Sequence, residues 1–233
     1  GIKEVVLTGI HIASYGKDFS NEDVSDISNE FKYTVRKKEF YLIDLLEEVQ
    51  KIDGIERIRL GSLEPTLITE EFVIRLSKLS KICNQFHLSL QSGCNETLKR
   101  MNRKYTTEEF EKGIELLRKA FKEVHLTTDI IVGFPGETEE EFEQTYKFLS
   151  KVKFYKMHVF KYSPRNGTVA AKMPNQIDGN IKEERSSKLI TLSNANEEKY
   201  NKQYLQKEIE VLLEDREGDY LKGHTTNYMV VKV

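Results

Sequence analysis

The sequence of 233 residues contains only two cysteines, Cys83 and Cys94, and no long apolar run. Two isolated cysteines provide neither a disulfide framework nor the spacing of a metal site, so we expect reduced thiols. The longest apolar runs, such as Ile130–Val132, fall far short of the roughly 20 residues of a transmembrane helix. The amino-terminal residues show no signal-peptide pattern. These absences predict a cytoplasmic protein with no membrane partner.

An excess of charge of either sign is also missing. The 36 Lys and Arg residues nearly balance the 38 Asp and Glu residues, which leaves a formal net charge of -2. Whole-chain electrostatics therefore do not indicate a nucleic-acid binder, and any contact with RNA has to rest on local patches. The sequence also lacks a Ser/His/Asp hydrolase signature and a phosphate-binding glycine loop.

What the sequence does contain is an alternation of strand and helix patterns. Strands are expected at 4–8, 57–60, 86–90, 124–132 and 157–160, and helical spacing of apolar residues at 42–52, 72–79, 106–121, 138–149 and 181–205. Thr106–Glu109 and Thr138–Glu141 are capping boxes, which mark helix starts. Strands that alternate with helices predict parallel pairing. The fold class is therefore α/β, with five units that form an open, partial TIM-like barrel.

The carboxyl-terminal residues follow a different pattern. Strand patterns at 208–213 and 228–231 have no helix between them, which predicts the start of a small antiparallel β domain. The expected division is a barrel with its closing helix at 1–206 and the incomplete β domain at 207–233. Near the other end of the chain, the polar segment 19–38 is expected to be a loop.

A polar or glycine-rich segment follows each of the five predicted strands, at 8–11, 61–65, 91–94, 133–138 and 162–168. In parallel barrels ligands bind at the carboxyl ends of the strands, which we call the rim. Asp129 lies inside an apolar strand, where a carboxylate is costly unless it is paired or used. The basic cluster Lys99–Lys104 can hold a carboxylate or phosphate. The strand-end segments are also compatible with ordinary turns, and the basic cluster with a solvated face. The residues alone indicate a ligand-binding partial barrel, and we expect an enzyme.

Taken together, these segments resemble the methylthiotransferase branch of the radical-SAM enzymes. The most specific stretch is TTDIIVGFPGET at 127–138, and the others lie at 6–16, 57–65, 87–106 and 158–171, in family order over nearly the whole chain. Within the branch, the loop at 9–11 and the strand at 158–160 look more like the enzymes that modify N6-threonylcarbamoyladenosine in tRNA. The resemblance implies a radical-SAM barrel followed by a small RNA-binding β domain of the TRAM type.

The resemblance also implies a reaction and its cofactors. A reduced [4Fe-4S] cluster would cleave S-adenosylmethionine to a radical that abstracts hydrogen from C2 of the modified adenosine beside the anticodon. A second [4Fe-4S] cluster would carry the methylthio group that replaces this hydrogen. The partners would be the tRNA anticodon arm and an electron donor. The residues implied at the cofactor site are Gly9, His11, Ser62, Glu64, Ser89, Gln91, Arg103, Asp129, Ile131, Gly133 and Val159.

Individual roles follow from the same resemblance. Gly9 and His11 would lie near the methionine end of the cofactor, and Arg103 would pair with its carboxylate. Gly133 and Val159, with Ile131, would frame the adenine largely through backbone groups. The side chains from the second and third strand ends would line the pocket between cofactor and nucleoside.

The chain also departs from the family pattern. The cluster-binding triad C-x3-C-x2-C is absent, and so are the first barrel strand and the preceding domain with three further cysteines. Five strands instead of six fit the loss of the first one. The start of the β domain is acidic, with Glu208, Glu210 and Glu214 among its side chains. We therefore expect a fragment of a longer enzyme that binds neither cluster and has no activity of its own.

Two other classes of protein remain open at this point. A cluster-free barrel enzyme would use Asp129, Glu137 or His11 in acid–base chemistry, and would turn over without iron or S-adenosylmethionine. A non-catalytic RNA-binding scaffold would carry a basic groove on the rim and bind tRNA in a salt-dependent way.

Overall fold

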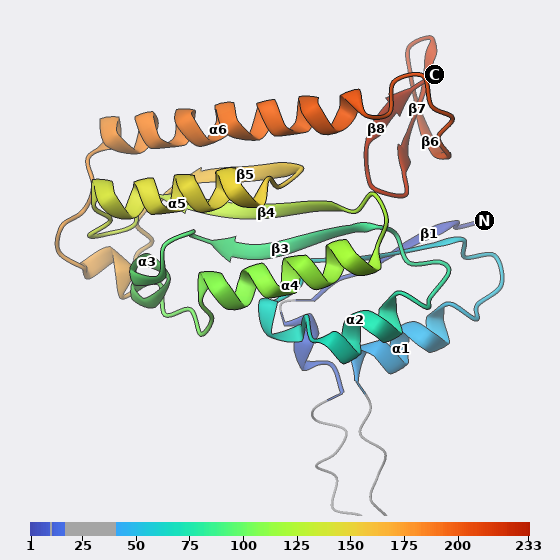
Figure 1. The fold of residues 1–233 in the computed structure, drawn as a ribbon, viewed down its shortest axis with the longest axis horizontal. Helices are drawn as coiled ribbons and strands as arrows, with labels where there is room; N and C mark the ends of the chain where they lie inside the picture. The colour runs from blue at the N-terminus through green and yellow to red at the C-terminus, as the bar shows by residue number, and fades with distance from the viewer. Residues whose placement is uncertain (10, 17–40) are drawn as a thin grey trace, which may run out of the picture.

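The computed structural model describes residues 1–9, 11–16 and 41–233, so the predicted loop at 19–38 lies outside the described residues. Strands and helices alternate along the chain, which confirms the predicted α/β class (Figure 1). The parallel strands are β1 (Glu4–Leu7), β2 (Arg57–Leu60), β3 (Gln85–Gln91), β4 (His125–Val132) and β5 (Lys156–Lys161). The α-helices are α1 (Leu42–Val49), α2 (Glu70–Leu76), α3 (Asn95–Arg100), α4 (Thr107–Ala120), α5 (Glu139–Val152) and α6 (Gly179–Lys202).

The strands follow one another in sequence order across the fold. β1 pairs with β2, and β3, β4 and β5 form a three-stranded parallel sheet. Between the β2 and β3 regions, the described residues form two isolated parallel bridges, Ile58 with Ile82 and Leu63 with Leu88. All five strands run in one direction, so their carboxyl ends lie together at the rim, as the open-barrel prediction requires (Figure 1).

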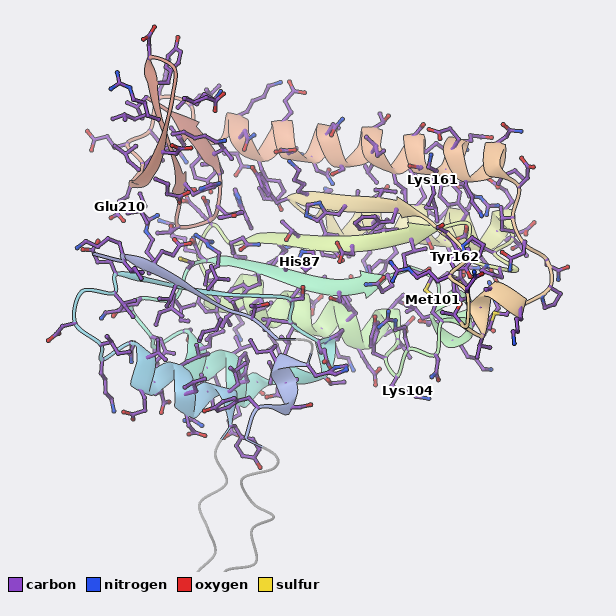
Figure 2. All side chains as sticks on the ribbon, turned by 180° about the vertical axis from the view of Figure 1, so that it is seen from behind. His87, Met101, Lys104, Lys161, Tyr162 and Glu210 are labelled. Atoms are coloured by element: carbon purple, nitrogen blue, oxygen red, sulfur yellow. The ribbon has the colours of Figure 1, made fainter. Side chains whose placement is uncertain are left out.

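Alternation of side chains along the strands separates two faces. In β3, Phe86, Leu88 and Leu90 are fully buried in the core formed with α1, α2, α4 and α5, while His87 and Ser89 are half-buried on the opposite face. We call this opposite face the inner face. No described α-helix of that group covers it, and Figure 2 looks onto it. The inner face is rich in polar side chains, whereas the helix-covered face is almost entirely apolar.

The helix starts follow the predicted signals. Thr106 and Thr138 each accept a hydrogen bond from the backbone three residues on, and Glu109 and Glu141 return the contact, so both predicted capping boxes are confirmed. Helix α6 is longer and more polar than the others. Among the described residues, no helix combines the length and the apolar character needed to cross a bilayer.

The carboxyl-terminal residues form a separate antiparallel sheet of β6 (Val211–Glu217), β7 (Tyr220–Thr225) and β8 (Val230–Lys232), in that order. The antiparallel arrangement was predicted, but β7 was missed because Gly223 and its polar neighbours interrupt the strand pattern. A Cβ atom on Gly223 would lie 2.0 Å from the carbonyl oxygen of Leu212, so the close pairing of β6 with β7 requires glycine there. The division at 206 stays a prediction.

This small sheet contacts the amino ends of the barrel strands, which we call the strand-start end (Figure 1). Arg57 donates to the carbonyl oxygen of His224 at 2.8 Å and to Glu210 at 2.7 Å. Arg59 donates to Glu4 at 2.9 Å, and its guanidinium lies 4.4 Å from the centre of the Tyr228 ring. Two buried arginines thus join the barrel to the small sheet.

Candidate functional site

The loops after β1 and β2 meet at the rim, where two of their described side chains are in contact. His11 Nδ1 lies 2.9 Å from Glu64 Oε1, and the two side chains are 71% and 40% exposed. Both residues were predicted site residues, and the structure places them together. Because the pair is exposed to water, it contributes little to stability and its polar atoms are accessible to a ligand. Gly9 and Ser62, from the same two loops, are also exposed.

A cavity of about 570 Å³ lies at the carboxyl ends of β3, β4 and β5. Three predicted residues line it, Gln91, Asp129 and Ile131. The rest of the lining comes from the end of β5 and the loop that follows, with Phe160, Lys161, Tyr162, Ser163, Arg165, Thr168 and Ala170. Figure 2 shows Lys161 and Tyr162 at this end of the sheet. A cavity of this size, lined by both polar and apolar side chains, is typical of small-molecule sites.

The loop after β4 is fixed by a buried ion pair. The backbone N–H of Gly133 donates to Glu137 Oε2 at 2.6 Å, and Arg185 of α6 donates to the same oxygen at 2.7 Å. The Arg185 and Glu137 side chains are 6% and 1% exposed. Burial raises the pKa of Glu137, while the Gly133 N–H and the Arg185 guanidinium oppose this rise. Glu137 therefore holds the backbone at Gly133, and its carboxylate is not accessible for acid–base chemistry.

Asp129 faces the inner side of the sheet. Its Oδ2 atom lies 3.2 Å from His87 Nε2, and the hydrogen bond from His87 lowers the pKa of the Asp129 carboxyl. The Asp129 carboxylate, which looked costly in the sequence, is half-buried and paired. His87 was not a predicted site residue, because a lone histidine in a strand gives no signal of what it will face.

Other predicted residues lie away from the cavity. Arg103 is exposed and is not among the lining residues, whereas Arg165 is. The side chain of Val159 packs against the hydrophobic core, and its neighbour Phe160 faces the cavity instead. The carbonyl oxygen of Ser89 accepts a hydrogen bond from Tyr105 at 2.8 Å. Arg165 belongs to a rim segment that the sequence singled out, but its side-chain direction could not be deduced from the pattern.

Comparison with known proteins connects these segments to one superfamily. The family model described as "Radical SAM superfamily" matches residues 2–149. The chain is 42% identical over 99% of its length to "Threonylcarbamoyladenosine tRNA methylthiotransferase MtaB" of Bacillus subtilis (strain 168). It is also 42% identical, over 99% of its length, to "tRNA-2-methylthio-N(6)-dimethylallyladenosine synthase" of Alkaliphilus oremlandii (strain OhILAs). The chain spans about half the length of these curated relatives, 49% of the first and 46% of the second.

Solved structures with the same fold are more distant in sequence. Coproporphyrinogen III oxidase (HemN) from Escherichia coli superposes with a TM-score of 0.53 at 17% identity, covering 65% of this chain and 36% of that one. The archaeal Elp3 of Methanocaldococcus infernus gives a TM-score of 0.51 at 16% identity and covers 95% of this chain and 65% of that one. At these identities the likeness concerns the fold alone.

Proposed function

The chain belongs to the radical SAM superfamily, and on this premise we propose that the whole protein is a tRNA methylthiotransferase. We propose that it transfers a methylthio group to C2 of N6-threonylcarbamoyladenosine beside the anticodon, in the cytoplasm, with the anticodon arm and an electron donor as partners. The 42% identity with the Bacillus subtilis relative over 99% of the chain carries the methylthiotransferase class. The loop at 9–11 and the strand at 158–160, which look more like the enzymes that modify N6-threonylcarbamoyladenosine, support that substrate. The barrel at 1–206 would hold the cofactor, and the β unit at 207–233 would belong to an RNA-binding domain.

The superfamily implies S-adenosylmethionine and a four-iron four-sulfur cluster as cofactors. The cavity at the rim fits the first of these in size and in chemistry. Arg165 can pair with a carboxylate, Gln91 can bond polar groups, and Phe160 provides an apolar ring surface. The exposed His11–Glu64 pair adds a hydrogen-bonding group on the neighbouring loops. The proposed cofactor residues remain those implied by the resemblance, with Arg165 added.

The residues of this chain do not fit the cluster. Its two cysteines are both buried and lie on either side of β3, a strand that spans roughly 23 Å at ~3.3 Å per residue. Burial raises the pKa of Cys83 to about 11, which opposes the thiolate form that binds iron. We therefore assign no cluster ligand and no radical step to this chain. What its own residues would do is bind and orient S-adenosylmethionine and the substrate base.

The substrate is tested by expressing the whole protein in a bacterial host that lacks its own methylthiotransferases. Digested tRNA is then analysed by liquid chromatography and mass spectrometry. The expected product is the 2-methylthio derivative of N6-threonylcarbamoyladenosine. If the 2-methylthio dimethylallyl derivative appears instead, the substrate is that of the Alkaliphilus relative. If neither derivative is formed, the proposed activity is contradicted.

The cofactor site is tested separately by equilibrium dialysis of S-adenosylmethionine with purified protein. Arg165→Ala should weaken binding at least tenfold, because a charge-assisted hydrogen bond contributes about 1.5–3 kcal/mol. Gln91→Ala should weaken it less, and Gln203→Ala, at the exposed end of α6, should leave it unchanged. Equal affinity for S-adenosylmethionine in all three variants would show that the rim cavity is not the cofactor site.

A further inference from the structure

Three metal-ligand side chains lie together in the middle of the inner face. His87 comes from β3, Asp129 from β4 and His158 from β5. Asp129 and His158 are direct neighbours in the β4–β5 register, and His87 is opposite Thr127, two residues before Asp129. One ligand atom from each of the three lies within 4.8 Å of the other two. Figure 2 shows His87 near the centre of the sheet, away from the rim residues Lys161 and Tyr162.

The distances around His87 suit a shared ion. Its Nε2 atom lies 3.2 Å from Asp129 Oδ2. Two ligand atoms that each bind one ion at about 2.1 Å are themselves roughly 3.0–3.4 Å apart. The other nitrogen, Nδ1, lies 3.0 Å from the Thr127 hydroxyl, which also accepts a hydrogen bond from Gln85 at 3.2 Å. If Nδ1–H donates to Thr127, Nε2 keeps its lone pair, which is how outer groups orient metal-binding histidines.

His158 supplies the third ligand. Within the described part of the chain, no hydrogen bond is made by its ring nitrogens, and its ring centre lies 5.8 Å from that of His87. The His158 side chain is the most exposed of the three, so rotation about its side-chain bonds can bring its nitrogen closer to the ligand atoms of His87 and Asp129.

The surrounding charges allow a cation to bind. Arg59 and Lys156 are cationic side chains that line the same cavity as the two histidines, and each has an acidic partner. Lys156 lies 3.1 Å from Glu197, and Arg59 lies 2.9 Å from Glu4.

The cluster also has access to open space on both sides. His87 and His158 line a cavity of about 680 Å³ towards the strand-start end, and Asp129 lines the cavity of about 570 Å³ at the rim. Two histidines and one carboxylate with open coordination positions are the ligand set of non-haem iron and of catalytic zinc sites. We propose that His87, Asp129 and His158 bind one divalent transition-metal ion of the zinc or ferrous class. This site contains no thiolate, is distinct from an iron–sulfur cluster, and does not depend on the proposed methylthiotransferase activity.

The test measures metal binding directly, without S-adenosylmethionine, tRNA, iron or sulfide. Purified protein is stripped with a chelator and titrated with Co²⁺, followed by its visible absorption, and with Zn²⁺, followed by calorimetry. The wild type should bind one ion per chain. The variants His158→Ala and Asp129→Asn should each bind it at least 100-fold more weakly. The matched control is His224→Gln, because His224 also pairs with a carboxylate, Glu214 at 2.8 Å, but has no third ligand.

A second variant separates metal ligation from a simple hydrogen-bonded pair. Thr127→Val removes the group that orients His87 without removing a ligand, and should weaken binding about 10- to 100-fold. Circular dichroism and thermal unfolding confirm that each variant is folded. Binding of the wild type with no defined stoichiometry, or equal affinity of wild type and His158→Ala, would reduce the cluster to a His87–Asp129 ion pair and overturn the proposal. Because no product is measured, failure here leaves the proposed function untouched.

Discussion

The two ends of the parallel sheet differ in how their polar side chains are used. At the strand-start end, Arg57 and Arg59 are 6% and 5% exposed, and both are occupied by carboxylates or carbonyl oxygens of the small sheet. At the rim, the His11–Glu64 pair is 71% and 40% exposed, and an open cavity lies at the ends of β3, β4 and β5. Buried, saturated polar groups hold elements together, whereas exposed polar groups beside a cavity are available to a ligand. The buried polar groups that join elements thus lie at one end and the accessible ones at the other, which is the usual division in parallel barrels.

One feature of the rim departs from this division. The Gly133 loop is held by the Glu137–Arg185 ion pair, whose side chains are as buried as the arginines at the strand-start end. Arg185 belongs to α6, and its guanidinium also lies 5.2 Å from the centre of the Phe142 ring. Fixing this loop keeps the backbone at Gly133 in one position beside the cavity. Local rigidity at the rim therefore supports the geometry of a site rather than the docking of another unit.

The largest expected effect comes from the strand-start end. Arg59→Met should lower the free energy of unfolding by about 3–5 kcal/mol, because Glu4 would lose its partner in a site where it is 15% exposed. The carbonyl oxygens of Thr225 and Thr226 would also lose a donor. Urea unfolding followed by circular dichroism measures the change. Lys222→Met, in an exposed pair with Glu217, is the control and should cost under about 1 kcal/mol. Similar losses in both would contradict the contrast between the ends.

The same end should make stability depend on pH. His125 is buried against Tyr155 with ring centres 3.9 Å apart, and burial lowers its pKa from 6.5 to about 4. Between these values the unfolded chain binds the proton and the folded protein does not, so stability falls as pH drops from 6.5 to about 4. The contribution should approach about 3 kcal/mol. Urea midpoints at several pH values should show a shallower fall in His125→Phe, and an unchanged fall in the exposed variant His11→Gln.

A smaller effect is expected at the tied loop of the rim. Gly133 has φ +69°, and a Cβ atom there would lie 2.3 Å from Cγ of Lys182, whose Nζ donates to the carbonyl oxygen of Tyr162. Gly133→Ala should therefore lower the free energy of unfolding by about 1–2 kcal/mol for the backbone alone, and further through the displaced lysine. Gly54→Ala is the matched control, since Gly54 has φ +85° and open space around it. If both variants lose the same stability in urea unfolding, the contact with Lys182 is unimportant.

The sequence predicted what local patterns determine. The five parallel strands and both capping boxes depend on short-range periodicity and spacing, and all are present. Strand β7 was missed because Gly223 serves a close backbone contact rather than a packing position. The tie of Glu137 to Arg185 was also missed, because an arginine in a polar helix gives no sign of the buried partner that tertiary packing brings to it.

The sequence predicted only part of the candidate site, because strand ends follow from local patterns and side-chain contacts do not. The rim segments could be placed at strand ends from their order, and Gln91, Asp129 and Ile131 do line one cavity. Side-chain direction was not predictable, so Arg165 lines the cavity and the predicted Arg103 does not. The grouping of His87 with His158 depends on the register between strands, which is a property of the folded sheet and not of either segment.

The smallest effect on stability is expected where the rim is most open. His11→Ala should change the free energy of unfolding by less than about 0.5 kcal/mol, because its contact with Glu64 is exposed to water and screened. The same change should weaken S-adenosylmethionine binding in equilibrium dialysis, since it removes a hydrogen-bonding group beside the proposed site. Arg59→Met should show the reverse pattern. It should lose much of the free energy of unfolding, while its folded fraction keeps an unchanged affinity for S-adenosylmethionine. If His11→Ala instead unfolds the protein, polar contacts at the rim also hold the fold together, and exposure beside a cavity no longer marks the residues that bind a ligand.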